Sequence, residues 1–159
     1  MPSAALIDFE TLDLSRVVVT RDEVRKFCKQ RGEFEMVDGL LHFDLEGKRA
    51  VGFKDLRSDA WWAAGHIPGR PIFPGALQCE GAAQLCTYDF MHRRLDLAGA
   101  FVGFAGLNDT RFRGIVEPPC RLIWVGEVRS IRRTIFTYYT QGFVDKKLVF
   151  ETEIMGVVV

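Results

Sequence analysis

The segment from Ala76 to Met91 places the strongest constraint on how this chain can fold. It contains no proline, it is too long for a typical strand, and its only formal charges are Glu80 and Asp89. These properties predict a helix whose surface is small or apolar on nearly every side. A helix that is apolar all round must be buried. The rest of the chain is therefore expected to enclose it.

The segments around this helix are mostly typical of strands. Thr20-Arg-Asp-Glu23 has the spacing of a capping box, which predicts a short helix ending at about Gln30. Alternating and β-branched residues predict strands at 36–44, 48–56, 100–107, 121–129, 134–144 and 148–158. Turns are expected at Glu46-Gly47 and at 145–147. The predicted fold class is α+β, with an antiparallel sheet wrapped around one long buried helix.

Length and charge narrow the classes of partner. The 159 residues suit a single domain, with 1–33 as an N-terminal extension carrying the short helix and 34–159 as the core. Lys plus Arg and Asp plus Glu both number 21, so no net field favours nucleic acid or an anionic membrane. The N-terminus lacks the basic start and long apolar run of a signal peptide, and no segment predicts membrane insertion. A cytoplasmic protein is expected.

The cysteines and histidines do not form a recognisable metal pattern. The four cysteines show no CxxC spacing, and the chain has only 3 histidines. Disulfides, a structural metal and a nucleotide site are therefore not expected. No cofactor is predicted.

The loop from Gly65 to Gly75 carries the first candidate for chemistry. Prolines and glycines alternate through it, and it leads directly into the buried helix. Proline restricts the backbone and glycine allows close approach to a ligand, so the loop can hold His66 at low entropic cost. The Gly75 amide is expected at the helix N-terminus, unpaired and aligned with the helix dipole.

Glu80 follows His66 by 14 residues and is expected on the second turn of the helix. Burial of an isolated carboxylate raises its pKa, which would make Glu80 a proton donor near neutral pH. Elimination of water from a 3-hydroxyacyl thioester needs a base at Cα, an acid for the hydroxyl and a polariser for the carbonyl. His66, Glu80 and the Gly75 amide suit these roles in that order. Taken singly, a loop histidine or a helical glutamate is more often structural, so the combination carries the hypothesis.

The same residues resemble a known family, the bacterial (3R)-hydroxyacyl-acyl-carrier-protein dehydratases of fatty-acid synthesis. The family pattern is G-H-F-P-G-x-P-[IL]-[MF]-P-G followed by a helical Glu. This chain has Gly-His-Ile-Pro-Gly-Arg-Pro-Ile-Phe-Pro-Gly at 65–75, Glu80 at the family's interval and Gln84 in its A-Q segment. Further likeness at 34–38, 47–54 and 111–118 extends the resemblance over about 34–155.

This resemblance implies a hot-dog fold and a homodimer, alone or as a trimer of dimers, in which His66 of one subunit works with Glu80 of the other. It implies acyl carrier protein, with its phosphopantetheine-linked substrate, as the partner. The acyl tunnel is expected beside Trp61, Trp62, Ile67 and Phe73, although the family usually has a Phe pair where this chain has the two tryptophans. Arg111 and Arg113 are the candidates for a basic surface that meets the acidic carrier.

Two alternatives stay open at this stage. Hot-dog thioesterases carry an Asp a few residues before a Gly-His loop, whereas Asp59 lies seven residues before His66. A non-catalytic acyl-binding module would need the tunnel but not both His66 and Glu80. The isomerising dehydratases have Asp where this chain has Glu80. Dehydration without isomerisation, in fatty-acid or related lipid synthesis, fits the residues best.

Overall fold

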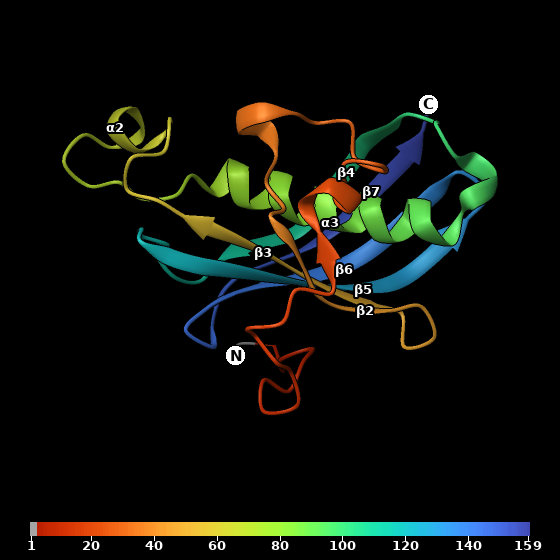
Figure 1. Cartoon of the computed structure of the whole chain (residues 1–159), viewed down its shortest axis with the longest axis horizontal. Coiled ribbons are helices and arrows are strands. Elements are labelled where there is room, and N and C mark those ends of the chain that lie inside the picture. The colour runs from red at the N-terminus through yellow and green to blue at the C-terminus, as the bar shows by residue number, and fades with distance from the viewer. Residues whose placement is uncertain (1–2) are drawn as a thin grey trace.

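A computed structural model describes residues 3–159 and shows one long helix, α3 (Gly75–Arg93), enclosed by a curved antiparallel sheet (Figure 1). The strands follow the order β1-β2-β3-β5-β6-β7-β4 across the sheet. Their bounds are β1 Val19–Thr20, β2 Gly39–Asp44, β3 Arg49–Leu56, β4 Val102–Phe112, β5 Cys120–Arg132, β6 Ile135–Val144 and β7 Lys147–Val158. The shorter helices are α1 (Arg21–Val24), α2 (Ala63–His66) and the 3₁₀ turns Gly32–Phe34 and Leu95–Leu97. The predicted α+β architecture is confirmed.

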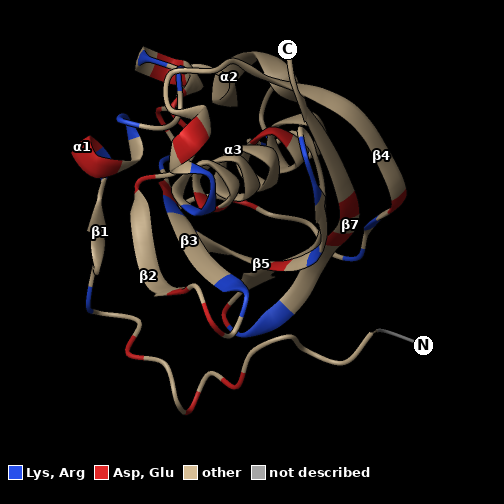
Figure 2. Ribbon diagram, turned by 90° about the vertical axis from the view of Figure 1, so that its right-hand side faces the viewer, with Lys and Arg blue, Asp and Glu red and all other residues tan. Residues whose placement is uncertain are grey.

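The helix α3 lies very close to the sheet at Gly81. A Cβ atom added at Gly81 would lie 2.3 Å from the indole carbons of Trp124 on β5. Trp124 is completely buried, and so is Leu122 two residues earlier on the same face of the strand. Figure 2 shows the strands curving around α3, so the helix is in contact with β3, β5, β6 and β7. The glycine lets the helix axis approach the sheet closely enough for this enclosure.

The outer face of the sheet carries a second apolar cluster, made of Leu41, Val51, Phe53, Ile123, Val125 and Phe143. Residues 3–18, here called the N-terminal strap, run across this face (Figure 2) and pack Leu6, Ile7, Phe9, Leu12 and Leu14 on it. Gln141 fixes the strap's backbone, because its Oε1 accepts from the Leu6 amide at 2.7 Å and its Nε2 donates to the Ala4 carbonyl at 2.9 Å. The strap therefore shields apolar surface that the sheet would otherwise expose.

Three predicted elements differ from the observed ones, and one of them, the strand expected at 36–44, begins only at Gly39. The capping box at Thr20 and Glu23 is present, but α1 ends at Val24 instead of continuing to Gln30. The Arg31 guanidinium donates to the carbonyls of Arg25, Cys28 and Gln30, which turns this segment back toward α3. Strand β4 extends to Phe112, beyond the predicted end at 107. Pairing with β7 holds residues 108–112 in the sheet across a bulge, where Asp109 has φ 49°.

We expect Gly81→Ala to destabilise the fold by about 1–3 kcal/mol, because the new methyl group must displace a fully buried indole. Gly126→Ala is the matched control, since a Cβ there meets its nearest neighbour, Cys86 Sγ, at an ordinary 3.6 Å. Urea unfolding measures both free energies of unfolding. Equal stability of the two variants would show that the helix does not depend on this contact.

Candidate functional site

His66 lies at the end of α2, on an exposed loop that stands off from the sheet (Figure 1). Its Nδ1 is 2.8 Å from the carbonyl oxygen of Ile72. A carbonyl can only accept, so Nδ1 carries the hydrogen in this contact and Nε2 keeps its lone pair in the neutral ring. The loop thus fixes the ring orientation and leaves Nε2 free to act as a base.

Gly75 begins α3, as the sequence predicted. The Pro74 carbonyl accepts from the amides of Leu77 and Gln78, so the Gly75 amide precedes the first hydrogen bonds of the helix. A Cβ at Gly75 would lie 2.8 Å from the ring of Phe112, so a larger residue could not fit without moving that ring. The Gly75 amide therefore lies at the positive end of the helix dipole, beside the ring of Phe112.

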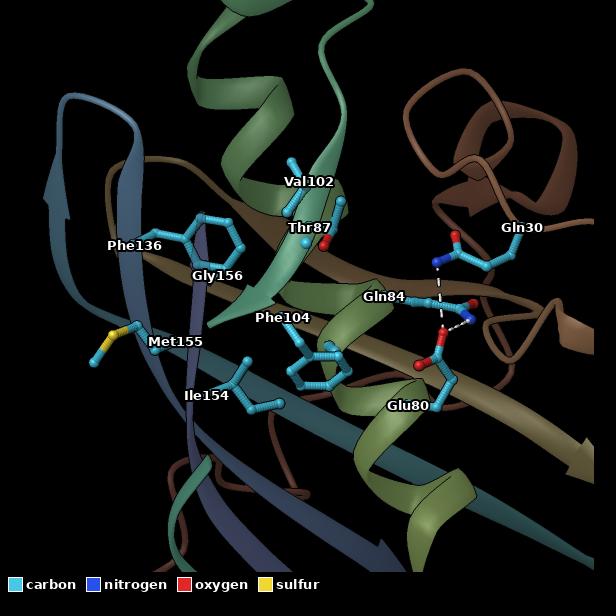
Figure 3. Close-up of a pocket in the computed structure, with 12 residues that line it drawn as sticks. Gln30, Glu80, Gln84, Thr87, Val102, Phe104, Phe136, Ile154, Met155 and Gly156 are labelled. Carbon is cyan, nitrogen blue, oxygen red and sulfur yellow. Dashed lines mark hydrogen bonds between the residues drawn. The ribbon is translucent and has the colours of Figure 1, made fainter. Parts of the chain in front are cut away.

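Glu80 is half-buried on α3 and is not the isolated carboxylate that the sequence suggested. Its Oε1 accepts a hydrogen bond from Gln84 Nε2 at 2.7 Å and one from Gln30 Nε2 at 3.4 Å (Figure 3). The spacing of four residues between Glu80 and Gln84 on one helix could have signalled the first contact. The contact with Gln30 joins residues 50 positions apart, and no local pattern signals it.

Two hollows meet at Glu80. One lies between α3 and the strands β4, β6 and β7 (Figure 3), and its lining residues include Gln30, Glu80, Gln84, Thr87, Phe104 and Phe136. The other is a groove between the first turns of α3 and the edge strand β4, lined by Ala76, Cys79, Glu80 and residues 104–107. The Glu80 side chain can therefore contact a molecule that enters either of these two hollows.

The structure of one chain does not bring His66 and Glu80 together at a common hollow. His66 is not among the described residues that line the two hollows at Glu80. The residues from 64 to 70 are all exposed, and so are Phe104 and Leu107 on the β4 edge. The loop that carries His66 and the β4 edge beside Glu80 are thus both accessible to another protein chain or to a ligand.

The four predicted tunnel residues divide into two pairs. Trp62 and Phe73 are buried in the main core, with ring centroids 5.1 Å apart in an edge-to-face contact. Trp61 and Ile67 are exposed, and Trp61 stacks on Phe34 at a centroid distance of 6.3 Å. None of the four lines the described hollows at Glu80, so their tunnel role stays a prediction.

Arg111 and Arg113 line one hollow on the outer face of the sheet but have different surroundings. Arg113 forms an ion pair with the buried Glu151, and its Nε donates to Glu151 Oε1 at 2.9 Å. Burial acts to raise the pKa of Glu151, but hydrogen bonds from Arg113, Tyr139 and Ser3 outweigh it and lower the pKa. The side chain of Arg111 forms no ion pair or hydrogen bond within residues 3–159. Arg111 is thus the arginine available to a partner.

Neither a metal cluster nor a membrane span is found in the described part of the chain. Residues 3–159 contain no group of three or more His, Cys, Asp or Glu side chains arranged to hold a metal ion. Within the same residues no helix is both long and apolar enough to cross a bilayer.

Comparison with known proteins identifies the family. The model of the FabA-like domain matches residues 29–153. The chain belongs to the FabA-like family. It is 35% identical to the 3-hydroxyacyl-[acyl-carrier-protein] dehydratase FabZ of Desulfotalea psychrophila, over 79% of this chain and 84% of that protein. It is 30% identical to FabZ of Campylobacter lari, over 86% of this chain and 95% of that protein. The resemblance stated from the sequence is confirmed.

Solved structures support the hot-dog fold of this FabA-like chain. The dehydratase heterocomplex ApeI:P from Xenorhabdus doucetiae matches with a TM-score of 0.74 at 8% identity, over 86% of this chain and 90% of that chain. The E. coli PaaI protein from the phenylacetic acid degradation operon matches with a TM-score of 0.56 at 13% identity, over 76% and 78%. At such low identity the likeness concerns the fold alone, and the predicted fold is confirmed.

We expect Arg113→Ala to lower the free energy of unfolding by roughly 1–3 kcal/mol, because it leaves the buried Glu151 carboxylate without its cation. Arg111→Ala, two residues earlier, is the control and should change stability by less than about 0.5 kcal/mol. Thermal and urea unfolding compare the two. If both variants unfold alike, the ion pair contributes nothing to the fold.

Proposed function

We propose that this FabA-like protein dehydrates (3R)-3-hydroxyacyl-acyl carrier protein to trans-2-enoyl-acyl carrier protein in fatty-acid or related lipid synthesis. The observation that carries the proposal is the presence of both His66, with Nε2 free, and Glu80, held by neutral amides, in a chain that belongs to this family. The names of its FabZ relatives state the same reaction. A cytoplasmic location stays a prediction from the sequence.

The residues divide the elimination into matched steps. His66 Nε2 removes the proton at Cα, and the thioester carbonyl gathers negative charge beside the Gly75 amide. As the double bond forms between Cα and Cβ, the C–O bond at Cβ breaks and Glu80 gives its proton to the departing hydroxyl. Water leaves, His66 holds one proton, and Glu80 is ionised. Transfer of that proton from His66 to Glu80 through water restores the starting state.

A second copy of the chain would complete this site. Within one chain, His66 and Glu80 lie in separate surroundings, while the edge strand β4 exposes Phe104 and Leu107 beside the groove at Glu80. An exposed apolar sheet edge favours pairing with another chain. We propose a homodimer, alone or in a trimer of dimers, in which the loop of one subunit brings His66 to the partner's groove. The acyl chain, linked to acyl carrier protein, would enter the same groove.

The carrier proposal centres on Arg111. Acyl carrier protein presents an acidic surface, and a cation without an internal partner can meet it at little cost to the fold. Arg113 forms an ion pair with Glu151, so it would have to give up that ion pair, and the stability it provides, in order to bind the carrier.

Replacing Glu80 tests the acid. Glu80→Gln keeps the shape but removes the transferable proton, so dehydration should fall by roughly 10²–10⁴-fold. The enoyl product is followed by absorbance with a 3-hydroxyacyl carrier substrate, and circular dichroism reports the fold. Turnover near the wild-type rate in a folded Glu80→Gln protein would reject the acid assignment and favour an acyl-binding role.

Mixing two inactive variants tests the shared site. His66→Ala and Glu80→Gln homodimers should each be nearly inactive. When the two are unfolded and refolded together, random pairing makes about half of the dimers mixed, and each mixed dimer contains one intact site by two-fold symmetry. Activity should therefore return to roughly a quarter of a wild-type control refolded in the same way.

The control for this experiment is the composition of the refolded dimers. A tag on one variant allows the mixed dimers to be isolated and counted. Activity that stays at the level of the parents, with mixed dimers present, would place His66 and Glu80 of one chain in one site.

A further inference from the structure

The orientation of the Gln84 amide is fixed by main-chain groups. Gln84 Oε1 accepts from the Met36 amide at 2.9 Å, and Gln84 Nε2 donates to the Phe34 carbonyl at 2.7 Å. An amide proton can only be donated and a carbonyl can only accept, so the reversed orientation would lose both bonds. Gln84 therefore presents only N–H to Glu80.

This orientation determines the role of each oxygen of Glu80. Oε1 receives the N–H of Gln84 at 2.7 Å, so it must act as an acceptor whether the carboxyl group is ionised or protonated. In a protonated carboxyl group only one oxygen is a pure acceptor, and the other carries the hydrogen. The proton that Glu80 transfers is thus assigned to Oε2, which Figure 3 shows turned toward the side of the pocket where Phe104 lies.

Gln30 is directed at the same acceptor oxygen. Its Nε2 lies 3.4 Å from Glu80 Oε1, and both residues line one hollow. Its own Oε1 is buried without a hydrogen-bond partner among residues 3–159. Leaving a buried carbonyl unpaired lowers stability, so the fold alone does not account for an amide at this position.

The segment that carries Gln30 is held firmly. Arg31 donates to the carbonyls of Cys28 and Gln30 at 2.8 Å and 2.6 Å, and the buried Cys28 thiol contacts the Gln84 carbonyl at 3.4 Å. The Gln30 side chain thus projects from a fixed base toward Glu80.

We infer that Gln30 is a positioning residue for Glu80: together with Gln84 it holds Oε1 as the acceptor and keeps the transferable proton on Oε2. This inference rests on the proposed dehydratase function. Gln30 acts through Glu80 and not on the substrate, so its removal should slow proton transfer while substrate binding stays the same.

Gln30→Met tests this role, because methionine has a similar length and no hydrogen-bond donor. We expect kcat to fall roughly tenfold with KM within twofold of the wild type, as a misplaced acid affects the chemical step. The melting temperature should stay the same or rise, since the unpaired carbonyl is removed. Lys29→Met introduces the same side chain at the exposed neighbouring position and should keep full activity.

The decisive measurement is a double-mutant cycle under single-turnover conditions. If Gln30 acts only through Glu80, Gln30→Met should add no loss to the residual rate of Glu80→Gln. A further tenfold loss in the double variant, or wild-type kcat in Gln30→Met, would overturn the positioning role. Full activity of Glu80→Gln would instead overturn the proposed function itself, so the two failures are distinguishable.

Discussion

The contact between Gly81 and Trp124 is the constraint on which the other features depend. It lets the helix approach the sheet closely, so that strands from β3 to β7 enclose it. A helix enclosed in this way cannot solvate its polar groups freely, and each one needs a partner from the protein. The two carboxylates of α3, Asp89 and Glu80, satisfy this requirement in opposite ways, and the difference bears on which of them suits the proposed reaction.

Asp89 is held by an ion pair with Arg93. It is fully buried, accepts from Arg93 Nε at 2.6 Å, and accepts from the hydroxyl of Tyr138. Burial and the nearby carboxylate raise the pKa of Tyr138, which therefore remains a hydrogen-bond donor. Glu80 forms no ion pair with the described residues, 3–159, and is held by the neutral amides of Gln84 and Gln30. The surroundings of Glu80 therefore suit the acid of the proposed reaction, and the ion pair of Asp89 suits a structural group.

The sequence predicted the parts of this site that depend on local patterns. The helix with Glu80, the loop with His66 and the Gly75 terminus were predicted because prolines, glycines and apolar spacing act over a few residues. The strand predicted from Met36 begins only at Gly39, because the Met36 amide bonds the side chain of Gln84 instead of a neighbouring strand. That contact and the approach of Gln30 depend on packing between distant segments, which no local pattern encodes. The division of the chain into an N-terminal extension, 1–33, and a core, 34–159, remains a prediction from the sequence.

The two faces of the sheet explain how one surface stays open for assembly. The outer face is apolar, but the N-terminal strap covers it and is fixed there by Gln141, and by Arg121, whose Nη1 donates to the Leu14 carbonyl at 3.0 Å. The β4 edge and the loop with His66 have no such cover within residues 3–159. The strap therefore leaves the β4 edge as the surface for the proposed homodimer, because the apolar cluster on the outer face is already covered. Since that edge borders the groove at Glu80, a second chain paired there in the proposed homodimer would lie next to the proposed acid.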